Sequence, residues 1–332
     1  MAIIFAKSSA LNDDLWKVND QIVRSILKDT DLEKNNDDEL VKALFNVKTS
    51  KKFAEKSSGL TEFANFEIVD EGDAGINDEI QQGWSKLIEH KQFIKTFTCT
   101  AEMNEDGDID SMTEAAANFM RAYKRTRAQY ASDALVTEGA SFTFGGKTLD
   151  KTTGDALGLF STAHKGVKSG VATQANVFTN AFGADAAMLN RLANIGRNFK
   201  NDSGNVIGHT FDTIVIPGNA YALEDTIRKI IKSDLTVGSN LNDVNTQKGL
   251  WKLVVDHRWQ VASGSPYIVM SSEANKELSG NVFYDRIPLT VKDWVDNKTF
   301  NLEWSGRARM SAGFRNWRHV IMGGATVGTT LS

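Results

Sequence analysis

Cysteine is almost absent from this chain of 332 residues, which contains Cys99 alone. A single cysteine excludes an intrachain disulfide and any metal site built from several cysteines, and it fits a reducing compartment. Cys99 lies in the alternating run "FIKTFTCTAEM". A thiol nucleophile is one interpretation of this residue, but a small half-buried strand residue is the simpler one.

Long apolar runs are also missing. No segment approaches the roughly 18 apolar residues of a membrane span, and the apolar part of "MAIIFAKSSALNDD" is too short for the core of a signal peptide. We therefore expect a soluble protein that is made and kept inside a cell, with no membrane partner.

The chain has no excess of positive charge, because 42 Asp and Glu outnumber 38 Lys and Arg and give a formal net charge of -4. Tight binding of nucleic acid depends on clustered Lys and Arg that release counterions. The charge balance therefore argues against a protein whose main task is to hold nucleic acid, and any basic patch must be local.

The composition itself is that of a globular protein, with 41% hydrophobic and 24% charged residues. The length is sufficient for two or three modules with cores of their own.

The run "RARMSAGFRNWRHV" at 307–320 could be a nucleic-acid-binding site, since its arginines lie among aromatic residues. A period of two explains it more simply. One face of the expected strand carries Phe300, Leu302, Trp304, Ala308, Met310, Ala312 and Phe314. The other face carries Arg307, Arg309 and Arg315. We interpret the run as a strand, because its arginines alternate without needing a phosphate.

Helical periodicity is strongest in 110–139, where Ser111 and Glu114 have the spacing of a capping box and Gly139 is a natural stop. This stretch predicts one unusually long helix of about 25 residues. Shorter helices are predicted in 12–28, 36–47 and 184–200.

A long two-stranded excursion is predicted between these helices. The run "EFANFEIV" at 62–69 would lead out and "FIKTFTCT" at 93–100 would return, with an acidic, glycine-containing middle that cannot form a core. Further on, "SFTFGGKTL" predicts a hairpin with Gly145 and Gly146 at its turn, and 205–280 predicts a compact α/β unit.

Motifs for chemistry are weak. The "GGKT" run lacks the first glycine and the preceding strand of a phosphate loop. Ser161 and His164 could belong to a catalytic group, but a loop whose polar groups satisfy the backbone is the favoured interpretation. His209 and His257 have no carboxylate or Cys at ligand spacing. We therefore assign no catalytic, cofactor-binding or metal-binding residue and expect no cofactor.

The order of these parts resembles the major capsid proteins of tailed bacteriophages, an α+β fold of the Hong Kong 97 type, and Mu-like head subunits in particular. The segments that carry the resemblance are "RLANIGRNFKNDSGNVIGHTFDTIVIPGNAYALEDTIRKII", "LWKLVVDHRW" followed by "SPYIVMSS", and "FNLEWSGRARMSAGFRNWRHVIMGG". The resemblance implies an N-terminal arm at 1–57, an extended loop at 58–97, a peripheral domain with a long spine helix at 98–204 and 281–332, and an axial domain at 205–280.

The resemblance also implies a function without enzyme activity. Copies of the chain would form hexamers and pentamers that close an icosahedral shell around double-stranded DNA, held by weak nonspecific contacts. The implied location is the virion capsid, assembled in the cytoplasm of the host bacterium, with a portal and a decoration protein as further partners. No scaffolding helix precedes the arm, so a separate scaffolding protein is expected, and no cross-linking Lys and Asn pair can be assigned.

Two other function classes stay open from the sequence. One is the shell of an encapsulin-like nanocompartment, which shares this fold. The other is an enzyme or a nucleic-acid-binding module. Only the His164 loop and the C-terminal arginines support this class.

Contacts between subunits are predicted for the charged residues of two segments. The arginines Arg307, Arg309 and Arg315 suit bidentate pairing with carboxylates, and the first acidic candidates on a neighbour are Asp70, Glu71 and Asp73.

Overall fold

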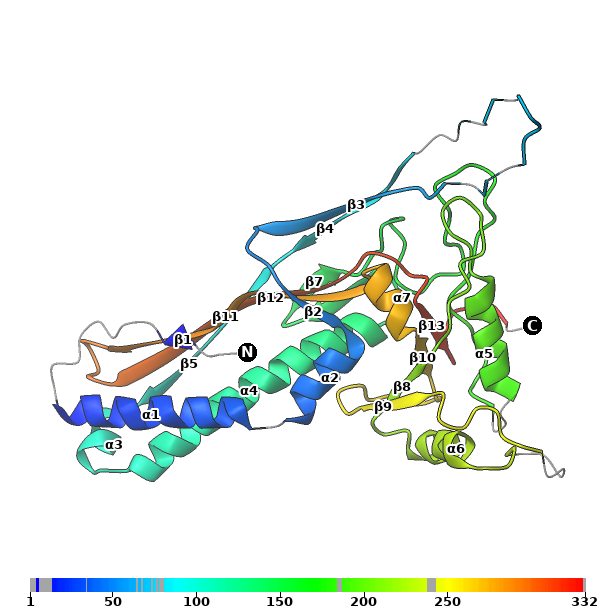
Figure 1. The fold of residues 1–332 in the computed structure, drawn as a ribbon. Helices are drawn as coiled ribbons and strands as arrows, with labels where there is room; N and C mark the ends of the chain where they lie inside the picture. The colour runs from blue at the N-terminus through cyan, green and yellow to red at the C-terminus, as the bar shows by residue number, and fades with distance from the viewer. Residues whose placement is uncertain are drawn as a thin grey trace. The chain divides into compact units, whose positions relative to one another are not determined.

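The computed structural model describes residues 4–5, 14–33, 35–63, 65–66, 68–72, 74–75, 77, 81–183, 187–237 and 243–330 (Figure 1). The chain divides into two compact units, each made of three segments. The first unit consists of Met1–Glu55, Ile88–Ala131 and Phe283–Ala312, and the second of Lys56–Leu87, Ser132–Val282 and Gly313–Ser332.

The first unit contains the long helix that the sequence predicts. Helix α4 spans Ile109–Val136, which is 28 residues. It begins two residues before the expected capping box, because the carboxylate of Asp108 accepts a hydrogen bond from the backbone N–H of Ser111 at 3.1 Å. A carboxylate at this position both satisfies a free N–H and interacts favourably with the helix dipole. The helix is confirmed, and its cap is Asp108 instead of Ser111.

The N-terminal helices of this unit are α1 (Asp14–Leu32) and α2 (Asn36–Leu44), followed by the short α3 (Ala101–Glu105) before α4. Helices α1 and α4 lie side by side in Figure 1. The ammonium of Lys124, on α4, donates to the backbone carbonyls of Thr30, Asp31 and Glu33 at 2.8, 2.9 and 3.0 Å. A buried lysine thus satisfies the free carbonyls at the end of α1.

A five-stranded sheet covers these helices. Its strands are β1 (Ile4–Phe5), β11 (Asn281–Val295), β12 (Leu302–Phe314) and β5 (Lys91–Cys99) in that order, and β2 (Asn46–Thr49) also pairs with β11. The core between helices and sheet contains Val23, Leu27, Cys99, Met112, Ala116, Phe119, Met120, Leu289, Val291, Leu302, Trp304 and Ala308. The expected alternation of β12 is confirmed from Leu302 to Met310. Phe300, which was expected on the same apolar face, precedes the strand in the turn and is 69% exposed.

The alternation ends there, because Ser311, Ala312, Gly313 and Phe314 are all buried. The hydroxyl of Ser311 is hydrogen-bonded to the ring of His90 at 2.9 Å, which covers the face where an exposed side chain was expected. Arg315 follows the end of the strand instead of continuing its polar face.

The two-stranded excursion exists, but its strands differ from those expected. It consists of β3 (Ala54–Leu60) and β4 (Gln82–Glu89). The run at 93–100 belongs to β5, which pairs with β12 from Leu302↔Cys99 to Met310↔Lys91. The described residues between Leu60 and Gln82 form no strand. The expected pairing was wrong, because Phe97 stacks on Trp304 with ring centroids 5.0 Å apart and fixes the partner of β5.

The second unit contains a four-stranded sheet in the order β13, β10, β8, β9. These strands are β8 (Thr213–Pro217), β9 (Lys252–Asp256), β10 (Tyr267–Met270) and β13 (Val320–Gly323). Its helices are α5 (Ala187–Asn198), α6 (Tyr221–Lys232) and α7 (Ser272–Glu277). Most of this sheet lies in the predicted 205–280 unit, and the C-terminal segment adds β13.

The hairpin predicted at 141–149 is confirmed as β6 (Ser141–Phe144) and β7 (Lys147–Asp150). Gly145 and Gly146 form its turn with φ of 56° and 75°, values that favour glycine. Across the described part of the chain, no helix is long and apolar enough to cross a membrane.

Candidate functional site

The arginines of β12 lie on the solvent face of the first unit's sheet. Arg307 is opposite Ile94 of β5, and Arg309 is opposite Gln92. Directly opposed residues of an antiparallel pair point to the same side. Arg307 is exposed, and the side chain of Ile94 is 58% exposed beside it. Arg309 is half-buried, and its guanidinium donates to the carbonyl of His90 at 3.4 Å.

Arg315 lies in a different setting from these two residues. Its backbone N–H donates to the carbonyl of Gly280 at 3.0 Å, and its own carbonyl accepts from Gly154 at 3.2 Å. It belongs to the second unit, whereas Arg307 and Arg309 belong to the first. The predicted set of three arginines is therefore one pair on a strand and one separate residue.

The predicted acidic residues lie in the segment between β3 and β4. Asp70 and Glu71 are exposed, and Asp73 lies outside the described residues. Within one chain, no ion pair between described residues joins these carboxylates to the β12 arginines.

The same segment exposes apolar side chains that our sequence interpretation did not single out. Phe66 and Ile68 have fully exposed side chains at 105% and 100%, and Phe63 is 62% exposed. The available signal was the cluster of apolar residues in "FANFEIV" inside an otherwise acidic stretch. An exposed apolar cluster of this kind commonly marks a surface that another protein covers.

Both ends of the excursion are attached to the second unit. The carboxylate of Glu62 accepts from the amide of Asn201, and the hydroxyl of Ser203 donates to the carbonyl of Glu62 at 2.6 Å. On the returning strand, the ammonium of Lys86 pairs with the carboxylate of Asp150. These contacts fix where the excursion leaves and rejoins the unit, and the apolar residues lie between them in the chain.

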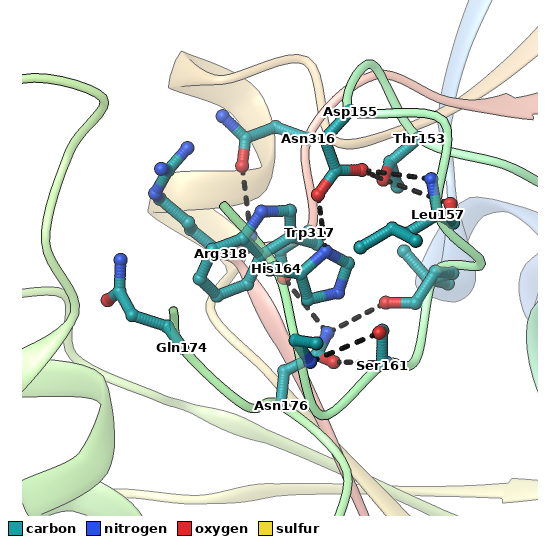
Figure 2. Close-up of polar contacts among 12 residues, drawn as sticks. Thr153, Asp155, Leu157, Ser161, His164, Gln174, Asn176, Asn316, Trp317 and Arg318 are labelled. Carbon is teal, nitrogen blue, oxygen red and sulfur yellow. Dashed lines mark hydrogen bonds and ion pairs between the residues drawn. The ribbon is translucent and has the colours of Figure 1, made fainter. Parts of the chain in front are cut away.

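Figure 2 shows the polar cluster around His164, the strongest candidate for chemistry in the sequence. The Nδ1 atom of His164 lies 2.7 Å from the carboxylate of Asp155, and the imidazole stacks on Trp317 with ring centroids 4.3 Å apart. Burial opposes ionisation of Asp155, but hydrogen bonds from His164 and Thr153 outweigh it and lower the pKa of this carboxyl. His164 is fully buried.

Ser161 forms hydrogen bonds within the loop near this histidine. Its hydroxyl accepts from the N–H of Ala163 at 3.2 Å, and its own N–H donates to the side-chain oxygen of Asn176 at 2.9 Å. The amide of Asn176 also donates to the carbonyl of Leu159 at 2.8 Å. The favoured interpretation is confirmed for Ser161, whose polar groups bond to the loop and its backbone. The imidazole of His164 differs, because it bonds to the carboxylate of Asp155 and its buried Nε2 atom has no hydrogen-bond partner among the described residues.

The remaining candidates are His209 and Cys99, which are buried, and His257, which is exposed. Burial lowers the pKa of His209 and raises the pKa of Cys99 to about 11, so the thiol is neutral at physiological pH. Cys99 is buried in β5, as the strand interpretation predicts. Among the described residues there is no group of three or more His, Cys, Asp and Glu side chains placed to hold a metal ion.

Comparison with known proteins agrees with this fold. Over its full length the chain is similar to a structure of Mycobacterium phage Patience, at 11% identity and a TM-score of 0.54, and covers 95% of that chain. A structure described as the capsid of a native GTA particle matches 90% of this chain and 92% of its own, at 10% identity and a TM-score of 0.56. A comparison with curated protein sequences gave no match.

The sequence profile of one protein family, described as phage capsid protein, matches residues 85–323, which is more than two thirds of the chain. This range contains β5, α4, the sheet of the second unit and the β12 arginines. The chain therefore belongs to the phage capsid protein family, and it is a structural subunit of a phage capsid.

Proposed function

We propose that copies of this chain associate as hexamers and pentamers into a closed icosahedral shell that encloses double-stranded DNA. Family membership and the capsid-like fold support this function. Its role is structural, without a catalytic step. The proposed location is the virion capsid after assembly in the cytoplasm of the host bacterium.

The observation that carries this proposal is the exposed apolar side chains of Phe66 and Ile68 between β3 and β4. Burying a large apolar side chain contributes roughly 1.5–3 kcal/mol relative to leaving it in water. A two-stranded sheet of this kind has little independent stability. A neighbouring copy in a shell would cover these side chains, and the same contact would recur around every ring of subunits.

The second proposed contact is between charged groups of adjacent subunits. Arg307 and Arg309 would pair with carboxylates of the neighbour, with Asp70 and Glu71 as the first candidates and Asp73 as a third. Arg315 remains a candidate for a separate contact. One surface ion pair contributes only about 0–1 kcal/mol, but a shell repeats it at each equivalent interface.

The four-part division stays part of this proposal, with the arm at 1–57, the extended loop at 58–97, the peripheral domain at 98–204 and 281–332, and the axial domain at 205–280. A separate scaffolding protein, a portal and a decoration protein are the proposed partners besides the chain itself and its DNA.

The test is the assembly state of the purified protein, with and without its scaffolding protein, by light scattering and negative-stain microscopy. We expect closed shells from the native chain. Phe66→Asp with Ile68→Asp should leave free subunits, whereas the control Phe66→Leu with Ile68→Val should assemble. Shells from the aspartate variant would show that these side chains do not form the contact. A native protein that stays monomeric in every condition would contradict the proposed function itself.

A further inference from the structure

Helix α5 presents an unusual surface for a protein of net negative charge. The segment 187–201 contains Arg191, Arg197 and Lys200 and no carboxylate. Both arginines are exposed. The remaining exposed polar residues of the helix are the amides Asn190, Asn194 and Asn198. The helix therefore offers the solvent only cations and amides along this face.

This face borders a hollow of about 560 Å³ within the second unit. Asn190, Asn194 and Arg197 line one side, and Phe211, Leu250 and Trp251 line the other. The two sides are linked through Gln247. Its amide nitrogen donates to Asn190 Oδ1 at 2.7 Å, and its amide oxygen accepts from the indole N–H of Trp251 at 2.7 Å. These bonds hold Asn190 and Trp251 in place beside the two arginines.

The described residues that line the hollow carry two positive charges, on Arg191 and Arg197, and one negative charge, on Asp212. Neither Arg191 nor Arg197 forms an ion pair with a carboxylate in the part of the chain that the structure describes. Asp212 also lines the hollow. Its Oδ1 atom already accepts hydrogen bonds from the backbone N–H and the hydroxyl of Ser272, both at 3.0 Å.

Helix α6 shows the opposite arrangement and serves as an internal comparison. Arg228 pairs with Glu224 at 2.7 Å, and Lys229 pairs with Asp225 at 2.6 Å, one helical turn away in each case. A cation that is already paired with a carboxylate attracts a polyanion less strongly. The arginines of α5 have no such carboxylate partner among the described residues, so they attract a polyanion more strongly.

We propose that the hollow beside α5 binds the phosphodiester backbone of the enclosed DNA and so marks the surface of the subunit that faces the shell interior. This inference rests on the proposed shell function. Arg191 and Arg197 neutralise phosphates, and the side-chain N–H groups of Asn190 and Asn194 donate hydrogen bonds to phosphate oxygens. Each site is weak, but many copies in one shell act together along a single polymer. This local patch is compatible with the negative net charge of the chain.

The test measures binding of a fluorescent double-stranded DNA of arbitrary sequence to the full-length protein by anisotropy over a series of salt concentrations. We expect Arg191→Gln with Arg197→Gln to weaken binding roughly tenfold and to reduce the slope of log K against log salt by about 2, because two phosphate contacts are lost. The matched control, Arg228→Gln with Lys229→Gln, should change the affinity less than about twofold. Equal losses in both variants, or none in the α5 variant, would overturn the proposal.

Two further measurements separate the alternatives. A polyglutamate probe tests for an acidic protein segment as the occupant: if the α5 variant loses polyglutamate binding but keeps DNA binding, the proposal is wrong. Asn194→Asp places a carboxylate in the hollow without removing an arginine, and it should also weaken DNA binding. Unchanged DNA binding by α5 variants that still form shells would contradict this site alone, whereas native protein without shells would contradict the proposed function.

Discussion

Arg307 of β12 lies directly opposite Ile94 of β5 on the solvent face of the first unit's sheet, so an exposed guanidinium and an exposed apolar side chain lie beside each other. On the other face of the same two strands, Phe97 stacks on Trp304 at an interplanar angle of 11°. The core face of this strand pair is buried, and the solvent face carries the arginines for which we propose contacts with a neighbouring copy.

The first prediction concerns this solvent face. Reversing both charges with Arg307→Glu and Arg309→Glu should abolish or misdirect shell formation, because carboxylates of the neighbour would meet like charges. The midpoint of thermal unfolding should change little, since Arg307 is exposed and contributes no described ion pair, and Arg309 gives up one long hydrogen bond, to the carbonyl of His90 at 3.4 Å. Negative-stain microscopy and calorimetry measure the two effects. Arg307→Lys with Arg309→Lys keeps the charge and should assemble. If the reversed variant assembles normally and loses only DNA, these arginines contact nucleic acid and not a neighbour.

The second prediction concerns proteolysis of dispersed subunits. A protease of broad specificity should cut first within about residues 70–85 and only later within 111–138. Asp70, Glu71 and Gly72 are exposed outside any strand, whereas 111–138 lies almost entirely in α4. Mass spectrometry of the first fragments identifies the sites. Assembled shells should resist cleavage in 70–85, and a dispersed subunit that is already protected there would contradict the proposed contact.

The third prediction concerns Gly306, whose absent side chain lets β12 approach α4. A Cβ atom at this position would lie 2.4 Å from the ring of Phe119 and 3.0 Å from Leu289 Cδ1. Gly306→Ala should lower the free energy of unfolding by about 1–3 kcal/mol through overpacking. Urea unfolding measures the loss, and Gly306→Ala with Phe119→Leu should recover part of it. Ser305→Ala is the control on the solvent face, and an equal loss there would exclude the overpacking explanation.

The fourth prediction concerns alkaline pH. Burial raises the pKa of Cys99 from 9.0 to about 11. The unfolded thiol loses its proton first as pH rises through this window, so the unfolded state is favoured and stability falls. The free energy of unfolding of the native chain should drop by about 2–3 kcal/mol more than that of Cys99→Ala between these pH values. Urea titrations at several pH values measure the difference, and parallel curves for the two proteins would contradict it. A thiol reagent should label Cys99 only after unfolding.

Local pattern alone determined several elements of this protein. The apolar positions of 110–139 specify α4, and the period of two in 302–310 specifies β12, because both patterns bury one face against the same core. The turn at Gly145 and Gly146 follows from backbone angles that glycine adopts readily. The order of these elements also carried the resemblance to phage capsid proteins that the family match confirms.

Tertiary structure decided which strands pair and which surfaces remain open. The polar run "AEKSSGL" has no alternation, yet it forms β3, because it pairs with β4 instead of burying a face of its own. A strand pattern at 93–100 does not name its partner; the stack of Phe97 on Trp304 selects β12. Likewise, the sequence shows where Arg191 and Trp251 lie in the chain but not that they border one hollow. Such pairings depend on contacts between residues far apart in sequence. These contacts form, and stabilise the structure, only when the chain folds.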